Sequence, residues 1–261
     1  FKSYSKYYDQ LYHDKNYNAE TDYLVNLITK YRENTKSIID LGCGTGKHAK
    51  LLANRGFEVT GLDLSQEMIS IAKQSSDLDF IIGDITNFKL DSTFDVALSI
   101  FHVFSYLTDN DVLLNAFSNI NRHLVVGGVL IVDVWHTPAV HSQLPEPRVK
   151  IVENDTYKIV RKATPAIDSL NNMVDVRYEL DVLHKETATH EIIIEDHHIR
   201  HFSKPEIELL SKCTGFKVLH SEELITAKKP SEQTWGVCYI LQKLFLIAIA
   251  TYLINIPASF I

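Results

Sequence analysis

The chain of 261 residues is long enough for one large α/β domain, and its 45% hydrophobic and 23% charged residues are typical of globular proteins. Its formal net charge of −7 argues against a nucleic-acid-binding protein, because a phosphate-binding surface needs an excess of Lys and Arg. Three widely spaced cysteines, Cys43, Cys213 and Cys238, indicate reduced thiols in a cytoplasmic protein and argue against a disulfide framework.

The N-terminal segment is rich in tyrosine, and Tyr4, Tyr8 and Tyr17 all fall within its first 17 residues. Tyrosine combines an apolar ring with a hydroxyl that can face a ligand, so this segment is expected to form a lid over a binding site. Packing of an amphipathic segment on the main domain is the alternative. From Asn18 onward, apolar residues recur at helical spacing and predict a helix. We assign residues 1–36 to this lid and helix.

A glycine-rich turn follows the first predicted strand. Residues 38–41 are β-branched or apolar around one acid and read as a short buried strand. Gly42, Gly44 and Gly46 then fall at alternate positions, where the chain must turn or be approached closely. Residues 47–53 are good helix formers. Strand, glycine turn and helix together indicate the first unit of a nucleotide-binding α/β sheet.

The spacing of these glycines argues against two common phosphate-binding motifs. A dinucleotide fingerprint has its third glycine three residues after the second, where this chain has Lys47. No Gly-Lys-Ser/Thr follows, which excludes a P-loop. The pattern Asp-x-Gly-x-Gly-x-Gly of residues 40–46 resembles instead the first motif of the class I S-adenosylmethionine-dependent methyltransferases. In that family the turn passes beside the methionine part of the cofactor. An ordinary tight turn is the alternative.

Further strands and helices alternate up to residue 134. Ser65 and Thr108 are expected to begin helices, and Gly127 and Gly128 to turn the chain into the last strand of this series. The predicted strands are residues 57–63, 79–85, 94–101 and 129–134. These spacings are suited to right-handed parallel crossovers.

Acidic residues stand at or near the ends of two of these strands. Asp63 stands where a nucleotide-binding fold places the carboxylate that accepts hydrogen bonds from ribose hydroxyls, although it could instead cap a turn. The resemblance to the methyltransferases implies that Asp84 meets the adenine amino group and that Ile85 packs on the ring.

The pattern changes after residue 144. Residues 149–200 alternate in polarity and predict three or four antiparallel strands, and a capping box at Ser203 begins a helix. Residues 216–219 and 235–241 are expected to form an antiparallel hairpin at the sheet edge. The predicted fold is α/β, a Rossmann-like, seven-stranded, mostly parallel sheet with a small inserted antiparallel sheet. Its parts are a methyltransferase domain (residues 37–144 and 202–242), the insertion (145–201) and an uncharged tail (244–261). The insertion is expected to form an acceptor or dimer surface. The tail could be a membrane anchor, a packing helix or foreign sequence.

Over residues 4–241 the chain is similar to a narrower group, the sugar N-methyltransferases that dimethylate the amino group of nucleotide-linked deoxyamino sugars. The similarity is carried by residues 8–9 with 17, 41–48, 61–68, 83–88, 99–107 and 133–138. It implies S-adenosyl-L-methionine as cofactor and a small-molecule amine acceptor. The net charge and the interrupted tail lead us to expect no nucleic-acid or membrane partner, and a homodimer is a possible assembly.

The motifs and the strand ends supply two sets of candidate site residues. The expected cofactor-binding residues are Tyr8, Tyr17, Asp40, Gly42, Cys43, Gly44, Gly46, Asp63, Leu64, Met68, Asp84, Ile85, Ile100 and Phe101. The residues expected to orient or deprotonate the acceptor are Tyr4, His102, Tyr106, Asp133 and Trp135. His197 and His201 share one face of a strand with Glu195 and could suit zinc, but we interpret them as a solvated or interface face and expect no metal.

The implied chemistry is an in-line displacement, for which proximity and orientation can supply on the order of 7–11 kcal/mol. An amine acceptor must present a free lone pair, so it must arrive neutral or lose a proton. Three alternatives stay open: an O- or N-methyltransferase of another small metabolite, a non-catalytic cofactor-binding or membrane-associated scaffold, and an NAD-dependent enzyme.

Overall fold

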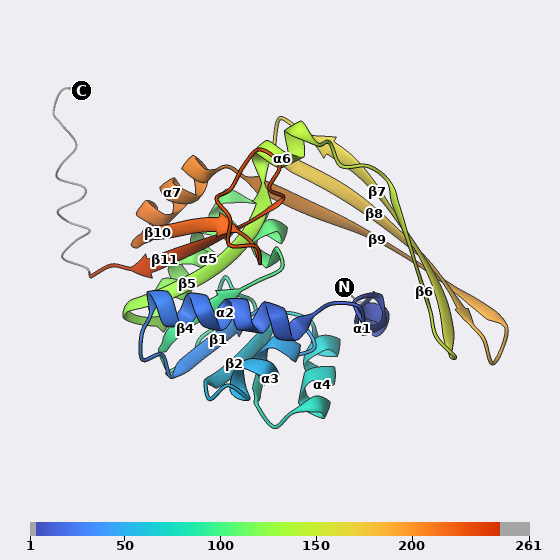
Figure 1. Ribbon diagram of the computed structural model, residues 1–261, viewed down its shortest axis with the longest axis horizontal. Helices are drawn as coiled ribbons and strands as arrows, with labels where there is room; N and C mark the ends of the chain where they lie inside the picture. Colours follow the sequence, from blue (N-terminus) through green and yellow to red (C-terminus); the bar gives the residue numbers. More distant parts are fainter. Residues whose placement is uncertain (1–3, 246–261) are drawn as a thin grey trace.

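A computed structural model of the chain describes residues 4–245, apart from the side chains of residues 4 and 5 (Figure 1). The core of this part is the mostly parallel sheet that the sequence predicts. Its parallel strands run in the order β3-β2-β1-β4-β5, and β11 and β10 follow in antiparallel pairing beside β5. The strands are β1 (Ser37–Leu41), β2 (Glu58–Asp63), β3 (Asp79–Ile82), β4 (Phe94–Ser99), β5 (Leu124–His136), β10 (Phe216–Glu223) and β11 (Gly236–Lys243).

Helices cover both faces of this sheet (Figure 1). One apolar core lies under α2 (Tyr17–Tyr31), α3 (Lys47–Ala53) and α4 (Gln66–Ser75). The other lies under α5 (Asn110–His123) and α7 (Lys204–Cys213). Because both faces are covered, the central strands are mostly apolar, and the carboxyl-terminal edge of the sheet is left for ligands.

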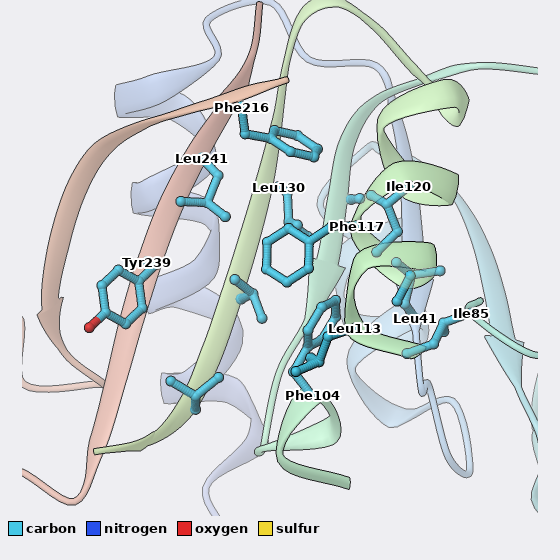
Figure 2. Close-up of a cluster of buried hydrophobic side chains, with 14 of the residues drawn as sticks. Leu41, Ile85, Phe104, Leu113, Phe117, Ile120, Leu130, Phe216, Tyr239 and Leu241 are labelled. Carbon is cyan, nitrogen blue, oxygen red and sulfur yellow. The ribbon is translucent and has the colours of Figure 1, made fainter. Parts of the chain in front are cut away.

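Phe117 lies at the centre of the second core. Its ring meets Phe104 edge to face at 5.1 Å between centroids, and it meets Phe216 in the same way at 6.2 Å (Figure 2). Edge-to-face pairs add to the stabilisation that burial alone provides. Phe117 therefore ties α5 to β10 and to the segment that follows β4.

Two local predictions about this region are wrong. The N-cap of α5 is Asp109, whose carboxylate accepts hydrogen bonds from the backbone N–H groups of Asp111 and Val112, and not Thr108. Gly127 and Gly128 do not precede the last parallel strand but lie within β5, beside an irregularity in its pairing with β4. A left-handed glycine can be accommodated in a strand at such an irregularity.

The inserted sheet has longer strands than the small sheet that the sequence predicts. They are β6 (Arg148–Glu153), β7 (Tyr157–Asp168), β8 (Met173–His184) and β9 (Thr189–Phe202), which pair antiparallel and project from the central sheet (Figure 1). The end of β9 pairs in parallel with the end of β5, after which α6 (Thr137–Ser142) leads into β6. The insertion therefore continues the central sheet and approaches its carboxyl-terminal edge.

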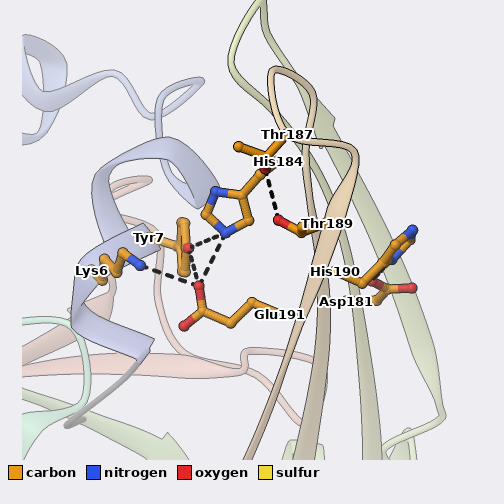
Figure 3. A network of polar contacts seen from close by, with 8 residues as sticks. All are labelled: Lys6, Tyr7, Asp181, His184, Thr187, Thr189, His190 and Glu191. Carbon is orange, nitrogen blue, oxygen red and sulfur yellow. Dashed lines mark hydrogen bonds and ion pairs between the residues drawn. The ribbon is translucent and has the colours of Figure 1, made fainter.

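The N-terminal segment packs on this projecting sheet. Its η1 (Tyr4–Tyr7) and α1 (Tyr8–Leu11) bury Tyr7 and Leu11 against apolar side chains of β6–β9. A polar contact closes the interface, where the Tyr7 hydroxyl donates to the Glu191 carboxylate at 2.6 Å and Lys6 pairs with the same group at 3.1 Å (Figure 3). The segment and the projecting sheet thus form one packed unit.

Between residues 4 and 245, none of the helices combines the length and the apolar composition of a membrane span. Nearly all of the uncharged tail, residues 246–261, lies outside the described residues.

Replacing Phe117 by Ala should lower the free energy of unfolding by about 3–5 kcal/mol, because it removes a fully buried ring between two aromatic partners. Urea denaturation followed by circular dichroism measures this loss. The matched control is Leu209→Ala on α7, where the side chain is 63% exposed and the effect should stay within about 0.5 kcal/mol. Equal losses in the two variants would contradict the assignment of Phe117 to the core.

Candidate active site

A cavity of about 690 Å³ opens at the carboxyl ends of β1, β2 and β4, beneath the N-terminal segment. This volume is typical of small-molecule sites. The structure brings most of the predicted residues to its wall. They are Tyr8, Tyr17, Asp40, Gly42, Cys43, Asp63, Leu64, Met68, Asp84, Ile85, Ile100 and Phe101 from the cofactor set, and His102, Tyr106 and Trp135 from the catalytic set.

Four predicted residues are not among those that line the cavity. Gly44 and Gly46 belong to the turn behind the cavity wall, where Gly46 is the N-cap of α3. Asp133 is fully buried and reaches the cavity only through His102. The side chain of Tyr4 lies outside the described part of the chain.

Several N–H groups of the glycine turn already have protein partners. The N–H groups of Gly42 and Cys43 both donate to the carbonyl of Leu62, at 2.7 and 3.1 Å, and the N–H of Gly46 donates to the Cys43 carbonyl at 3.0 Å. Turns that bind a pyrophosphate direct such N–H groups at the ligand. This turn therefore favours a nucleoside without a pyrophosphate, which argues against NAD.

The turn also passes close to the exit of β4. Gly42 has a φ of +78°, and a Cβ there would lie 2.6 Å from a methyl carbon of Val103. A side chain at this position would be strained and would push on the wall of the cavity. Only glycine permits this approach.

Asp63 fixes the turn and still faces the cavity. One carboxylate oxygen accepts the Gly44 N–H at 2.8 Å, and the other accepts the Ser65 N–H at 2.8 Å. Burial raises the pKa of Asp63, and these two N–H groups act against that rise. A carboxylate has about four lone-pair positions, so Asp63 can also accept hydrogen bonds from the two hydroxyls of a ribose. Asp40 lies nearby, where burial raises its pKa to about 6.

The third strand supplies a site suited to an adenine ring. One Asp84 oxygen accepts from both the N–H and the hydroxyl of Thr86, each at 2.8 Å, which orients the carboxylate. Ile85 and Met68 are buried apolar residues of the wall, and Leu64 is an exposed one. An acid beside apolar side chains can accept an amino group while the ring packs against carbon.

The N-terminal segment closes over the turn through Asp9. Its carboxylate accepts from the Thr45 hydroxyl at 3.1 Å and lies 2.9 Å from the Lys47 ammonium. Beneath it, the hydroxyl of Tyr17 is buried and has no hydrogen-bond partner among the described residues. A buried hydroxyl without a partner is costly, so it suits a polar group of a bound ligand. Together with the two acids, this hydroxyl fits a nucleoside with a polar tail.

Lys15 also lines the cavity, although it is not among the predicted site residues. Its ammonium lies 3.4 Å from the Glu20 carboxylate and faces the ring of Phe101. Burial lowers the pKa of Lys15 to about 8. The sequence signal that could have identified Lys15 is its position between the tyrosine-rich N-terminal segment and the first long helix.

A histidine and a buried acid meet on the other side of the cavity. Phe101 and His102 both have positive φ values, +69° and +66°, where the chain leaves β4. This strained exit directs the His102 ring toward β5, so that its Nδ1 lies 2.5 Å from an oxygen of the fully buried Asp133. The His102 N–H donates to the other oxygen at 3.2 Å.

The projecting sheet completes this wall with Tyr178, His197 and Ile199. Sequence reasoning left Tyr178 open between the acceptor site and a dimer face, and it did not place His197 or Ile199 in the site. His197 Nδ1 lies 2.9 Å from the Tyr106 hydroxyl, and its Nε2 lies 3.3 Å from Glu195. In the described part of the chain, no three His, Cys, Asp or Glu side chains are grouped to hold a metal ion. His201 instead meets the Thr137 hydroxyl at 2.9 Å.

The comparisons with known proteins agree with this geometry. Residues 38–128 match the methyltransferase domain family. The chain resembles a methyltransferase over this segment. In fold, it is similar to an amino pentose methyltransferase of Micromonospora echinaspora that was solved with S-adenosylmethionine bound, with a TM-score of 0.75 and 20% identity over 93% of this chain and 97% of the other. The cofactor of such methyltransferases is S-adenosylmethionine.

Sequence relatives differ in how much of the methyltransferase they cover. YqeM of Bacillus subtilis, itself a predicted methyltransferase, is 28% identical over 93% of this chain and 97% of its own length. A Streptomyces venezuelae enzyme, dTDP-3-amino-3,4,6-trideoxy-alpha-D-glucopyranose N,N-dimethyltransferase, is 31% identical over 50% of this chain and 56% of its own length. For four curated relatives, including this enzyme, the chain covers only 49% to 58% of the relative's own length.

Replacing Asp63 by Ala should weaken binding of S-adenosylhomocysteine by about 1–3 kcal/mol, because ribose hydroxyls would lose a charged acceptor. Calorimetric titration measures the change, and the melting temperature reports any loosening of the turn. Asp79→Ala, an exposed acid at the amino end of β3, is the matched control. Unchanged affinity in Asp63→Ala would rule out the ribose assignment.

Proposed function

We propose that this methyltransferase moves a methyl group from S-adenosylmethionine to the amine of a nucleotide-linked amino sugar. The observation that carries the proposal is the single cavity itself. It joins Asp63 and Asp84, which suit an adenosine, to His102, Tyr106 and Trp135, which suit a polar acceptor. The cofactor, when bound, supplies a methyl group that its sulfonium has already activated.

The task of the chain is to orient the acceptor and remove its proton. Asp133 is 0% exposed and lies beside His102 Nδ1, so it favours the tautomer with the proton on that nitrogen. His102 Nε2 then has a lone pair that can take a proton from the acceptor amine. A buried carboxylate that orients a histidine base in this way also stabilises the imidazolium that forms.

Two features support a sugar nucleotide as the acceptor. The Streptomyces venezuelae relative and two others carry names of dTDP-amino-sugar N,N-dimethyltransferases. We call the side of the cavity formed by His102, Tyr106, Trp135 and the projecting sheet the acceptor wall. Beside it, the Arg161 guanidinium lies 3.4 Å from the Tyr12 hydroxyl and packs over the ring of Tyr178. Guanidinium groups are well suited to phosphates, so Arg161 is our candidate for the diphosphate.

The direct test is to incubate the chain with S-adenosylmethionine and dTDP-3-amino-3,6-dideoxy-α-D-glucopyranose and to follow the sugar by mass spectrometry. We expect one or two methyl groups on the amine. The same sugar without its nucleotide, and a dTDP-sugar with a hydroxyl in place of the amine, are the controls.

Other outcomes point to the remaining candidates. Methylation of the hydroxyl sugar alone would indicate an O-methyltransferase. Turnover of an unrelated amine, with none of the dTDP-sugar, would indicate an N-methyltransferase of another metabolite. Tight binding of S-adenosylhomocysteine, with no transfer to any acceptor, would support a non-catalytic role.

His102→Asn and Asp133→Asn should each lower kcat by about 10²–10⁴-fold, because each removes or misorients the group that takes the proton. Affinity for S-adenosylhomocysteine should stay unchanged, since neither residue belongs to the adenosine side. Steady-state kinetics and calorimetry check the two parts, with exposed His13→Asn as the control. Unaltered kcat in both variants would exclude this pair as the base.

A further inference from the structure

One polar cluster beside the acceptor joins a tyrosine of the proposed site to two residues of β9 that have no role in the reaction proposed above. It consists of Tyr106 on η2 (Val103–Tyr106) with His197 and Glu195 on β9. His197 and Glu195 are two residues apart on one strand and so share a face. Tyr106 and His197 both line the cavity, and His197 is only 6% exposed. The inference drawn from this cluster rests on the proposed function.

The chemistry of the three groups fixes where the protons lie. An ionised carboxylate can only accept, so Glu195 favours a proton on His197 Nε2, 3.3 Å away. Burial lowers the pKa of His197, so its ring is neutral near pH 7. Its Nδ1 therefore has a lone pair and accepts the Tyr106 O–H at 2.9 Å.

Packing holds this arrangement in place. The ring of Tyr178 meets the His197 ring edge to face at 4.8 Å, and the ring of Tyr106 meets it at 5.7 Å. A histidine between two aromatic rings and a carboxylate cannot exchange its nitrogens without breaking both hydrogen bonds. The Tyr106 oxygen consequently presents lone pairs, and not its proton, toward the cavity.

We infer that His197 and Glu195 fix the Tyr106 phenol as a hydrogen-bond acceptor that holds one N–H of the acceptor amine. Tyr106 touches the substrate, whereas His197 and Glu195 are positioning residues. With one N–H directed at Tyr106, the nitrogen lone pair is turned toward the methyl donor. The nitrogen gains the methyl group, the sulfonium becomes a thioether, and the proton that leaves the nitrogen goes to His102. The substrate class that suits this contact is a primary or secondary amine, because each keeps an N–H while its lone pair is free.

The test compares kcat/KM for dTDP-3-amino-3,6-dideoxy-α-D-glucopyranose in a set of variants. Tyr106→Phe and His197→Leu should each lower it about tenfold to a hundredfold, because the amine loses its oriented partner. His197→Asn should restore most of the loss, since its carboxamide can accept the phenol proton near the position of Nδ1. His198→Leu, an exposed neighbour on the opposite face of β9, is the matched control and should match the wild type.

Two further readouts separate orientation from structure. Affinity for S-adenosylhomocysteine and the melting temperature should be alike in wild type, His197→Asn and Tyr106→Phe. Nitrogen-15 NMR of the wild-type protein should show His197 protonated at Nε2 and bare at Nδ1, a state that a merely structural histidine need not adopt.

The outcomes distinguish this inference from the function on which it rests. If the wild type methylates the sugar but Tyr106→Phe is unaffected, His197→Asn is as poor as His197→Leu, or Nδ1 carries the proton, the inference is wrong and the proposed function stands. If the wild type binds S-adenosylhomocysteine but leaves the sugar unmethylated, the proposed function fails and the inference fails with it.

Discussion

The hydrogen bond between the Gly44 N–H and the Asp63 carboxylate is the contact on which the site depends. It joins the end of β1 to the end of β2, which pair in parallel and have no direct turn between them. The N–H groups of Gly42 and Cys43 donate to Leu62, so these two amides of the turn are not offered to a ligand as donors. A nucleoside can then pack against the glycines and donate hydrogen bonds to the Asp63 carboxylate. This mode of binding does not require a phosphate.

Backbone strain at the end of β4 serves the same site. Phe101 and His102 are held at positive φ, which costs on the order of 1–3 kcal/mol for each residue. This backbone conformation lets the His102 N–H donate to one oxygen of Asp133 and places the His102 ring beside the other oxygen. The glycine at position 42 makes room for the residue that follows, Val103. The segments that follow β1 and β4 therefore pack closely against each other.

Local patterns predicted the parts of this molecule that are local. The strand, turn and helix around residues 38–53, the Ser65 cap and the capping box at Ser203 all follow from neighbouring residues, and the structure confirms them. Caps a residue apart could not be separated by the same reasoning, and Asp109 displaced Thr108 because a carboxylate reached two N–H groups at once. The same reasoning predicted Asp63 and Asp84 in the wall of the cavity, because these acids stand at or just after the ends of two consecutive strands.

The acceptor side depends on pairing over long distances in sequence. His197 meets Tyr106 only because β9 pairs with β8 along its length and then joins the end of β5. A sequence pattern shows which face of a strand His197 shares with Glu195, but it carries no information about the residue opposite that face. For this reason the histidine cluster looked like a solvated surface, whereas two of its members are buried.

The projecting sheet gives the lid and the acceptor wall a common support. Tyr7 and Leu11 of the N-terminal segment share one apolar cluster with β6–β9, and Tyr8 and Tyr178, which face the cavity, pack against that cluster. Asp9, next to Tyr8, is tied to the glycine turn by Thr45 and Lys47. Any opening that moves the lid must therefore break its contacts with the turn, with the sheet or with both. Because the sheet also carries His197, a motion of lid and sheet together would separate that residue from Tyr106, whereas a motion of the lid alone would not. Under the proposed function, access for the cofactor and orientation of the acceptor would thus be linked through one interface.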